Sequence, residues 1–211
     1  MSEIIQGTPE WHQARLGKVT ASKPSDVMAL GRGGAPSATP ATYRAQLVVE
    51  RLTGNPTEGF TNAAMAHGTE TEPQARATYI LTTGRMVSEV GFIDHPSISM
   101  AGASPDGLIG SDGLIEIKCP NSATHIATLR GSEIDGKYLK QMQWQMACTG
   151  RAWCDFVSFD PRLPDELQLH IRRVQRDPAM IVEMETAVRA FLEEVNEELA
   201  ALRKLYMREA A

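Results

Sequence analysis

The chain has 211 residues, of which 42% are hydrophobic and 22% are charged, a composition that is ordinary for a globular protein with a single core. No apolar run approaches the roughly 20 residues of a membrane-spanning helix, and no signal-peptide pattern opens the chain, so we expect one cytoplasmic domain over residues 1–211. The formal net charge of −5 at pH 7 argues only weakly against a nucleic-acid partner, because the local distribution of charge governs such binding.

The N-terminal part of the chain is predicted to be helical. Thr8 and Pro9 form a helix start, as N-cap and first helical residue, and the helix should end near Leu16. A short helix is expected around residues 25–30. The following stretch, 31–40, is rich in glycine, proline and small polar residues and is predicted to be a loop.

Two longer helices are predicted next. Thr39 and Pro40 repeat the start signal, with Thr39 as N-cap, and open a helix that Gly54 should end. A second helical pattern covers residues 63–83 and stops before a glycine.

The second half of the chain mixes strands and helices. Alternation and repeated turn signals predict a meander of short strands over 86–120. A mostly buried helix over 138–150, two strands over 153–160 and 167–174, and a long helix over 178–208 follow. The order of these elements indicates a single α/β domain.

The cysteines do not suggest a metal centre. Cys119, Cys148 and Cys154 are an odd number, and their spacing supplies neither a zinc knuckle nor four iron–sulfur ligands. We expect them to be buried thiols in a reducing compartment. Any metal would then be held by oxygen atoms.

Charged residues interrupt an apolar strand pattern in the middle of the chain. Glu116 and Lys118 are two residues apart, so in a strand they project to the same face. Turn signals over 110–113 fold the preceding strand back, which would bring Asp106 to the same end of the sheet. Two carboxylates, with the carbonyl of Ile117 between Glu116 and Lys118, would suit one or two Mg²⁺ ions, and an ammonium group would stabilise charge on a phosphodiester undergoing hydrolysis.

A solvent-exposed strand with a Glu–Lys pair is the alternative interpretation of this motif. Burial of charges in the apolar stretch 114–119 is costly unless they are paired or functional, which favours the active-site interpretation. Tyr138, Gln141 and Gln145 share one face of the predicted helix and suggest a polar cleft, although a solvent-facing surface would show the same spacing. Glu72 has an equally ordinary alternative, as a surface partner of Arg76 four residues later.

The sequence resembles the phage lambda exonuclease family, also described as YqaJ-like viral recombinases, within the PD-(D/E)xK nuclease superfamily. The resemblance implies a restriction-endonuclease-like core, a central mixed β-sheet flanked by α-helices. Five matching stretches occur in the family's order and cover most of the chain: EWHQARLGKVTAS (10–22), HGTETEPQAR (67–76), SPDGLIGSDGLIEIKCP (104–120), YLKQMQWQM (138–146) and WCDFVSFDPR (153–162).

The activity implied by this resemblance is that of a Mg²⁺-dependent 5′-to-3′ exonuclease acting on ends of linear double-stranded DNA and leaving 3′ single-stranded tails. The resemblance also implies a ring-shaped homotrimer and a single-strand annealing protein as partner, in phage or prophage recombination within a bacterial cell. Mn²⁺ is expected to substitute for Mg²⁺, and Ca²⁺ to inhibit, since it supports binding without turnover.

Site residues follow from the resemblance by position. Asp106 and Glu116 would be metal ligands together with the Ile117 carbonyl, and Lys118 would assist the nucleophilic water. Two further residues match positions in the family's active site: Glu72, as an additional acid near the second metal, and Gln141, as the glutamine.

The resemblance also implies a pocket for a terminal 5′ phosphate, at Arg15, Ser22 and Ser104. These residue types agree with that role, since Arg and hydroxyl groups bind phosphate oxygens. The loop 31–40 departs from the family, because it offers only Arg32 where lambda exonuclease is more basic. Other candidates for DNA backbone contacts are Lys18, Lys23, Arg44, Lys137 and Lys140.

Two other functions remain open on the sequence. An endonuclease of restriction or repair type would use the same acids and lysine but would have no use for a site that binds a DNA end. A non-catalytic DNA-binding or scaffold protein would retain the fold but would gain nothing from clustered buried charges.

Overall fold

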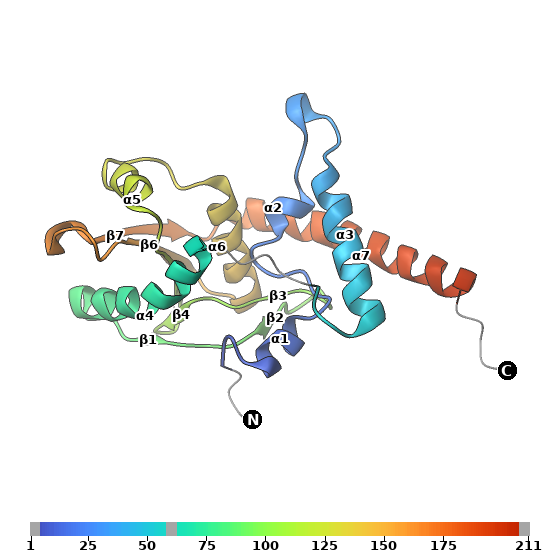
Figure 1. Ribbon diagram of the computed structural model, residues 1–211, viewed down its shortest axis with the longest axis horizontal. Coiled ribbons are helices and arrows are strands. Elements are labelled where there is room, and N and C mark those ends of the chain that lie inside the picture. Colours follow the sequence, from blue (N-terminus) through green and yellow to red (C-terminus); the bar gives the residue numbers. More distant parts are fainter. Residues whose placement is uncertain (1–4, 58–62, 207–211) are drawn as a thin grey trace.

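The computed structural model of the chain describes residues 5–57 and 63–206, which form a mixed β-sheet flanked by helices (Figure 1). The N-terminal helix α1, Pro9–Arg15, starts as predicted, and the Thr8 hydroxyl accepts a hydrogen bond from the Trp11 amide. The short helix α2, Pro24–Val27, begins slightly earlier than predicted and is shorter. A 3₁₀ turn, Arg32–Gly34, lies within the predicted loop.

Helix α3, Ala38–Thr53, begins before its predicted start, because Ser37 and not Thr39 is the N-cap. The Ser37 hydroxyl accepts a hydrogen bond from the Thr39 amide at 3.2 Å, and Pro40 then lies in the first turn, where no intrahelical bond is lost. Gly54 ends the helix with a φ of 68°, as predicted, in the left-handed conformation that glycine adopts without steric cost. Helix α4, Ala63–Thr83, has the predicted bounds.

The predicted meander divides between two sheets. A five-stranded sheet has the order β1-β4-β5-β6-β7, and β2 pairs only with β3. In the larger sheet β5 and β6 are parallel, and the other neighbours are antiparallel. The strands are β1 (Val87–Ser88), β2 (Ile93–Asp94), β3 (Gly102–Ala103), β4 (Gly107–Ile109), β5 (Gly113–Lys118), β6 (Trp153–Phe159) and β7 (Leu169–Gln175).

Three helices follow β5 along the chain. Helix α5, Ser122–Leu129, was not predicted from the sequence, although Asn121 caps it by accepting a hydrogen bond from the Thr124 amide at 2.9 Å. Helix α6, Gly136–Thr149, agrees with the prediction to within two residues. Helix α7, Pro178–Tyr206, packs along α3 and extends past it (Figure 1), and its predicted last two residues lie outside the described ranges.

The five-stranded sheet has a helix on each face. Leu114 of β5 packs in a cluster with Met142 and Met146 of α6, whereas Ile115 and Ile117 pack with Tyr79 of α4. This alternation is what the period of a strand requires, and it turns Glu116 and Lys118 toward α6.

Two further expectations can be compared with the described residues. Cys148 and Cys154 are buried free thiols as expected, whereas Cys119 is partly exposed. Over residues 5–57 and 63–206, no helix combines the length and apolar character that crossing a membrane requires.

Candidate active site

Strand register brings Asp106 and Glu116 together, as the sequence pattern predicts. Gly107 of β4 pairs with Ile115 of β5, so Asp106, the residue before β4, lies opposite Glu116. The Asp106 carboxylate accepts a hydrogen bond from the Ile117 amide at 2.7 Å. Since the N–H and C=O of one strand residue point to the same edge, the Ile117 carbonyl also faces the Asp106 side.

Asp106, Glu116 and Lys118, with Glu72 nearby, form an acidic cluster at the end of β5. The Glu116 carboxylate lies at its centre, and this residue is only 1% exposed. Its Oε1 lies 2.5 Å from the Lys118 ammonium and accepts a hydrogen bond from Gln141 Nε2 at 2.7 Å. Its Oε2 accepts a hydrogen bond from Gln145 Nε2 at 2.6 Å. The shared helix face of Gln141 and Gln145 is therefore directed at the acid, and not at solvent.

Charge in the cluster is unbalanced toward the negative. Burial raises the pKa of Asp106 well above its usual value, and the negative charges of Glu116 and Glu72 raise it further. Burial disfavours the ammonium form of Lys118, but Glu116 and Asp106 outweigh this effect and hold the Lys118 pKa above its usual value. Lys118 thus faces both Asp106 and Glu116, and the two acids repel each other, which favours binding of an additional cation.

Glu72 approaches the cluster from α4 but is also an ion-pair partner. Its Oε1 lies 2.5 Å from the Arg76 guanidinium, which in turn lies 3.1 Å from Glu89. Burial raises the Glu72 pKa, Arg76 opposes this effect, and Glu116 adds to it. The structure therefore contains the ion pair between Glu72 and Arg76 that was the alternative interpretation of Glu72. Glu72 also lies close enough to Glu116 for the two charges to interact.

Oxygen atoms are the only metal donors that this cluster offers. Among the described residues, no three His, Cys, Asp or Glu side chains are grouped tightly enough to hold an ion as they stand. Asp106, Glu116 and the Ile117 carbonyl nevertheless form a hard-oxygen donor set. A divalent cation would oppose the burial and the carboxylate repulsion that raise the Asp106 pKa. Glu116 would have to exchange one of its present contacts, of which that with Lys118 is the charged one.

A cavity of about 180 Å³, called the phosphate cavity below, borders this cluster and brings together the three residues to which the family resemblance assigns phosphate binding. Gln141 lines the cavity and also donates to Glu116, so it connects the two sites. The lining residues are Gln6, Trp11, Arg15, Ala21, Ser22, Ser104 and Gln141.

Hydrogen bonding prepares Ser104 to donate into the cavity. Its Oγ accepts from Trp11 Nε1 at 2.9 Å and from Arg15 Nη1 at 3.2 Å. A hydroxyl that accepts two hydrogen bonds still has its own proton to donate, and an anion in the cavity is a suitable acceptor. The Arg15 guanidinium lies 4.0 Å from the centre of the Trp11 ring. Sequence reasoning missed Trp11, although its position one helical turn before Arg15 indicates this contact.

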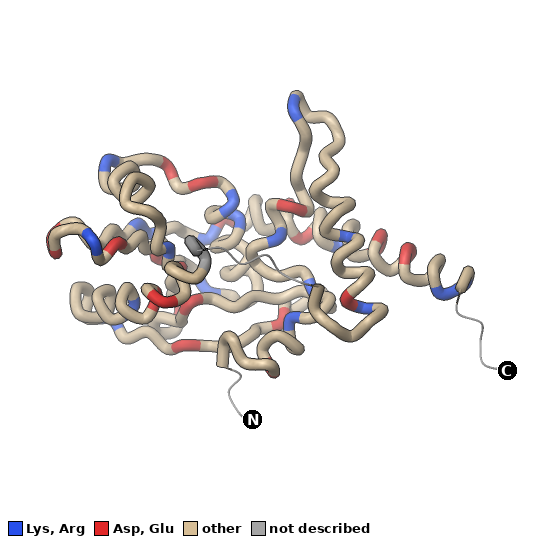
Figure 2. Tube along the Cα trace, in the orientation of Figure 1, with Lys and Arg blue, Asp and Glu red and all other residues tan. Residues whose placement is uncertain are grey.

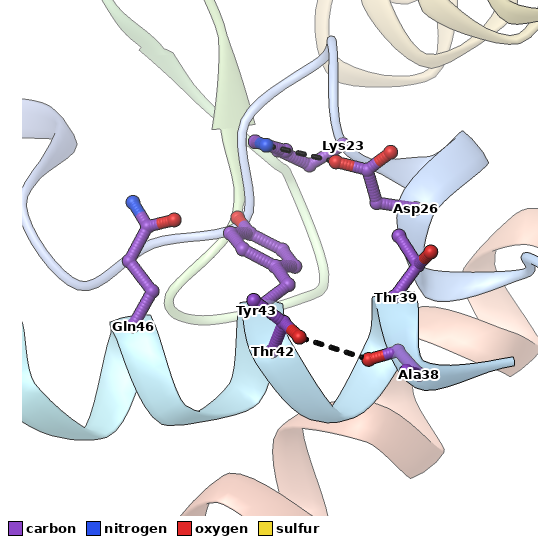
Figure 3. A pocket seen from close by; sticks show the side chains of 7 residues that line it. All are labelled: Lys23, Asp26, Ala38, Thr39, Thr42, Tyr43 and Gln46. Atoms are coloured by element: carbon purple, nitrogen blue, oxygen red, sulfur yellow. Dashed lines mark hydrogen bonds and ion pairs between the residues drawn. The ribbon is translucent and has the colours of Figure 1, made fainter. Parts of the chain in front are cut away.

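A second cavity, of about 260 Å³, lies between α2 and the start of α3 (Figure 3). Its one basic lining residue, Lys23, donates to the Asp26 carboxylate at 2.8 Å and lies 4.9 Å from the centre of the Tyr43 ring. Because Asp26 neutralises Lys23 within the cavity, charge there does not favour an anion.

Most cations proposed for DNA contacts are paired within the chain. Lys18 lies 2.6 Å from Asp94, Lys23 is paired as above, and Arg44 contacts Glu194 and Glu198 of α7. Basic and acidic positions are interspersed along the trace (Figure 2). Lys137 lies 3.5 Å from Asp135, so of the five candidates Lys140 alone has no ion pair among the described residues. Both lysines lie on the first turns of α6 beside Tyr138, whose ring centre is 4.8 Å from the Lys118 ammonium.

Comparisons with known proteins agree on one family. Residues 10–152 match the YqaJ-like viral recombinase domain. The crystal structure of an alkaline exonuclease, LHK-Exo, from Laribacter hongkongensis is 55% identical to this chain, with a TM-score of 0.87 over 93% of this chain and 97% of that chain. The structure of LHK-Exo in complex with dAMP gives the same identity and coverage, with a TM-score of 0.86.

A more distant structure shares the fold. A phage-related exonuclease from Haemophilus somnus 129PT is 17% identical, with a TM-score of 0.66 over 88% of this chain and 96% of that chain. The search of curated proteins found no match.

Proposed function

The chain belongs to the family of YqaJ-like viral recombinase domains, with the restriction-endonuclease-like fold expected from its sequence, and we propose that it is a DNA exonuclease. The observation that carries this proposal is the shared residue Gln141, which lines the phosphate cavity and donates to Glu116. Because this cavity lies beside the acidic cluster, a terminal phosphate bound in it would place the first phosphodiester bonds of a DNA end within reach of that cluster.

The proposed polarity is 5′ to 3′ on linear double-stranded DNA, which leaves 3′ single-stranded tails. Arg15 and Ser104 would bind a 5′-terminal phosphate, because the guanidinium and the free hydroxyl proton both donate to phosphate oxygens. Ser22, exposed on the cavity wall, would add a third donor.

The proposed cofactor is Mg²⁺, held by Asp106, Glu116 and the Ile117 carbonyl, with Glu72 near a second ion. When bound, the cation supplies Lewis-acid activation of the water and the phosphodiester. The chain's own contribution is electrostatic: Lys118, kept protonated by its two acidic neighbours, neutralises charge that develops on the phosphate. Gln141 donates to Glu116 Oε1 and so helps to orient this carboxylate. Mn²⁺ should substitute, and Ca²⁺ should support DNA binding without turnover.

Replacement of Arg15 tests the phosphate cavity. Arg15→Ala is expected to slow digestion of 5′-phosphorylated DNA about tenfold or more, and 5′-hydroxyl DNA much less, because it removes a charge-assisted contact that only the phosphorylated end makes. Initial rates on the two matched substrates measure this. Arg130→Ala, at an exposed arginine outside the cavity lining, is the control. Equal slowing on both substrates would mean that Arg15 does not bind the terminal phosphate.

An endonuclease of the same superfamily is the competing function. Incubation with covalently closed and linearised forms of one plasmid separates the two, because an exonuclease requires an end. We expect digestion of the linear form only, with nucleotides released and one strand surviving as a 3′ tail. Cleavage of the closed circle would reject the exonuclease assignment.

The assembly and biological setting are proposals drawn from the family resemblance. We propose a ring-shaped homotrimer that acts in the bacterial cytoplasm with a single-strand annealing protein, in phage-type recombination. Light scattering on the purified protein tests the trimer, since a monomeric mass during active digestion would exclude it.

A further inference from the structure

Gln145 of α6 is fully buried, with 0% of its surface exposed, but its hydrogen bonding is incomplete. Its Nε2 donates to Glu116 Oε2 at 2.6 Å. Its Oε1 is buried and has no hydrogen-bond partner among the described residues. A buried polar atom left unpaired lowers the stability of the folded state.

The orientation of this amide is fixed by its neighbour. A carboxylate oxygen only accepts hydrogen bonds, so the amide turns its nitrogen toward Glu116, and its oxygen is left without a partner among the described residues. The neighbouring positions Met142 and Met146 of the same helix pack with Leu114 of β5. A methionine or leucine at position 145 would have no acceptor to leave unpaired.

We infer that Gln145 is a positioning residue, which holds Glu116 in the rotamer needed to bind the catalytic cation at a cost in stability. The inference rests on the proposed function. Gln141 and Lys118 both act on Oε1 of Glu116, whereas Gln145 is the residue that constrains Oε2. Without it the carboxylate is held at Oε1 only, and its terminal torsion, which has a broad energy well, is less restricted. Mutation of a residue that orients a metal ligand typically lowers metal affinity or activity about 10- to 100-fold.

Gln143 supplies a matched control on the same helix. It is also buried, with 3% of its surface exposed. Its Nε2 donates to the Gln175 carbonyl, and its Oε1 accepts from the Asp177 amide, both at 2.8 Å. Both of its polar atoms are thus paired with backbone, at the junction of β7 and α7, and neither reaches the acidic cluster.

The test compares Gln145→Met with Gln143→Met. For Gln145→Met we expect a midpoint Mg²⁺ concentration for DNA digestion raised about tenfold, and a similar loss of Mg²⁺ affinity by calorimetry without DNA. Its melting temperature in EDTA should fall less than that of Gln143→Met, because removal of the unpaired acceptor offsets the loss of the hydrogen bond to Glu116. For Gln143→Met we expect a lower melting temperature with unchanged Mg²⁺ affinity. Gln145→Leu repeats the test with a second apolar side chain.

Opposite outcomes would overturn the inference. A lower melting temperature with unchanged Mg²⁺ affinity in the Gln145 variants, or failure of both variants to fold, would make Gln145 a structural residue like Gln143. Wild-type protein that neither binds Mg²⁺ nor digests DNA would instead contradict the proposed function. The two failures are therefore distinguishable.

Discussion

Lys118→Ala is expected to reduce hydrolysis of linear DNA by at least about a hundredfold, the usual cost of removing one preorganised electrostatic group from an active site. The Lys118 ammonium lies 2.5 Å from Glu116 Oε1 and is the cation that faces the acidic cluster at the end of β5. Its loss removes the ammonium group that would neutralise part of the charge developing on the phosphate. Nucleotide release from end-labelled linear duplex measures the effect.

Folding and DNA binding should survive this substitution. The Lys118 side chain is 27% exposed and ends its strand, and Gln141 and Gln145 still satisfy both oxygens of Glu116. DNA affinity, measured with Ca²⁺ in place of Mg²⁺, should therefore change little. Lys204→Ala, at an exposed lysine near the end of α7, is the control for loss of a positive charge. Unchanged turnover in Lys118→Ala would support a non-catalytic DNA-binding protein.

Asp106→Asn is expected to reduce the rate of digestion a hundredfold or more, because metal activation supplies several kcal/mol of transition-state stabilisation. The same substitution is expected to stabilise the metal-free protein at alkaline pH. Asparagine removes a carboxylate that repels Glu116 and Glu72, yet its side-chain oxygen can still accept the hydrogen bond from the Ile117 amide. Activity and stability should thus change in opposite directions.

The pH dependence of this stability effect has a defined sign. The folded-state pKa of Asp106 is raised above its unfolded value by burial, Glu116 and Glu72, so the folded chain binds the proton more tightly. The stabilisation from that proton is complete below the unfolded value, near 4, and is lost as pH rises through the folded value. Urea unfolding of both proteins in EDTA should show the advantage of Asp106→Asn at pH 8 and a smaller one at pH 4.5.

Addition of Mg²⁺ gives the complementary measurement. Mg²⁺ should stabilise the wild type through binding to the folded state, and should stabilise Asp106→Asn much less. A variant less stable than the wild type at pH 8 in EDTA would show that Asp106 is not under electrostatic strain. Equal stabilisation by Mg²⁺ would show that Asp106 is not a metal ligand.

Local chemistry explains which elements the sequence predicted. Thr8 and Gly54 act through groups within one helical turn, so their signals could be interpreted without knowledge of the fold. The N-cap of α3 was misassigned because Ser37 and Thr39 are both good caps and packing chooses between them. Helix α5 was not predicted because its local sequence signal is weak. Tertiary contacts help to hold it, since buried His125 contacts Ser158 and the Leu167 carbonyl.

The candidate site divides in the same way. That Glu116 and Lys118 share a face follows from the two-residue period of a strand, and the sequence alone determined it. Family resemblance, and not spacing, linked Arg15 with Ser104, which lie 89 residues apart. Neither the resemblance nor the residue spacing predicted the hydrogen bond between Trp11 and Ser104, because a contact between distant segments produces no periodic pattern in the sequence.

The sequence by itself determined the helix and strand periods, most of the caps and the pairing of an acid with a lysine on β5, since each depends on neighbours within a few residues. Only the tertiary structure decided that Gln141 joins the cluster to the phosphate cavity and that the Gln145 amide is left half-paired. These features depend on strand register and on the packing of α6 against the sheet, which bring together segments that have no contact in the unfolded chain.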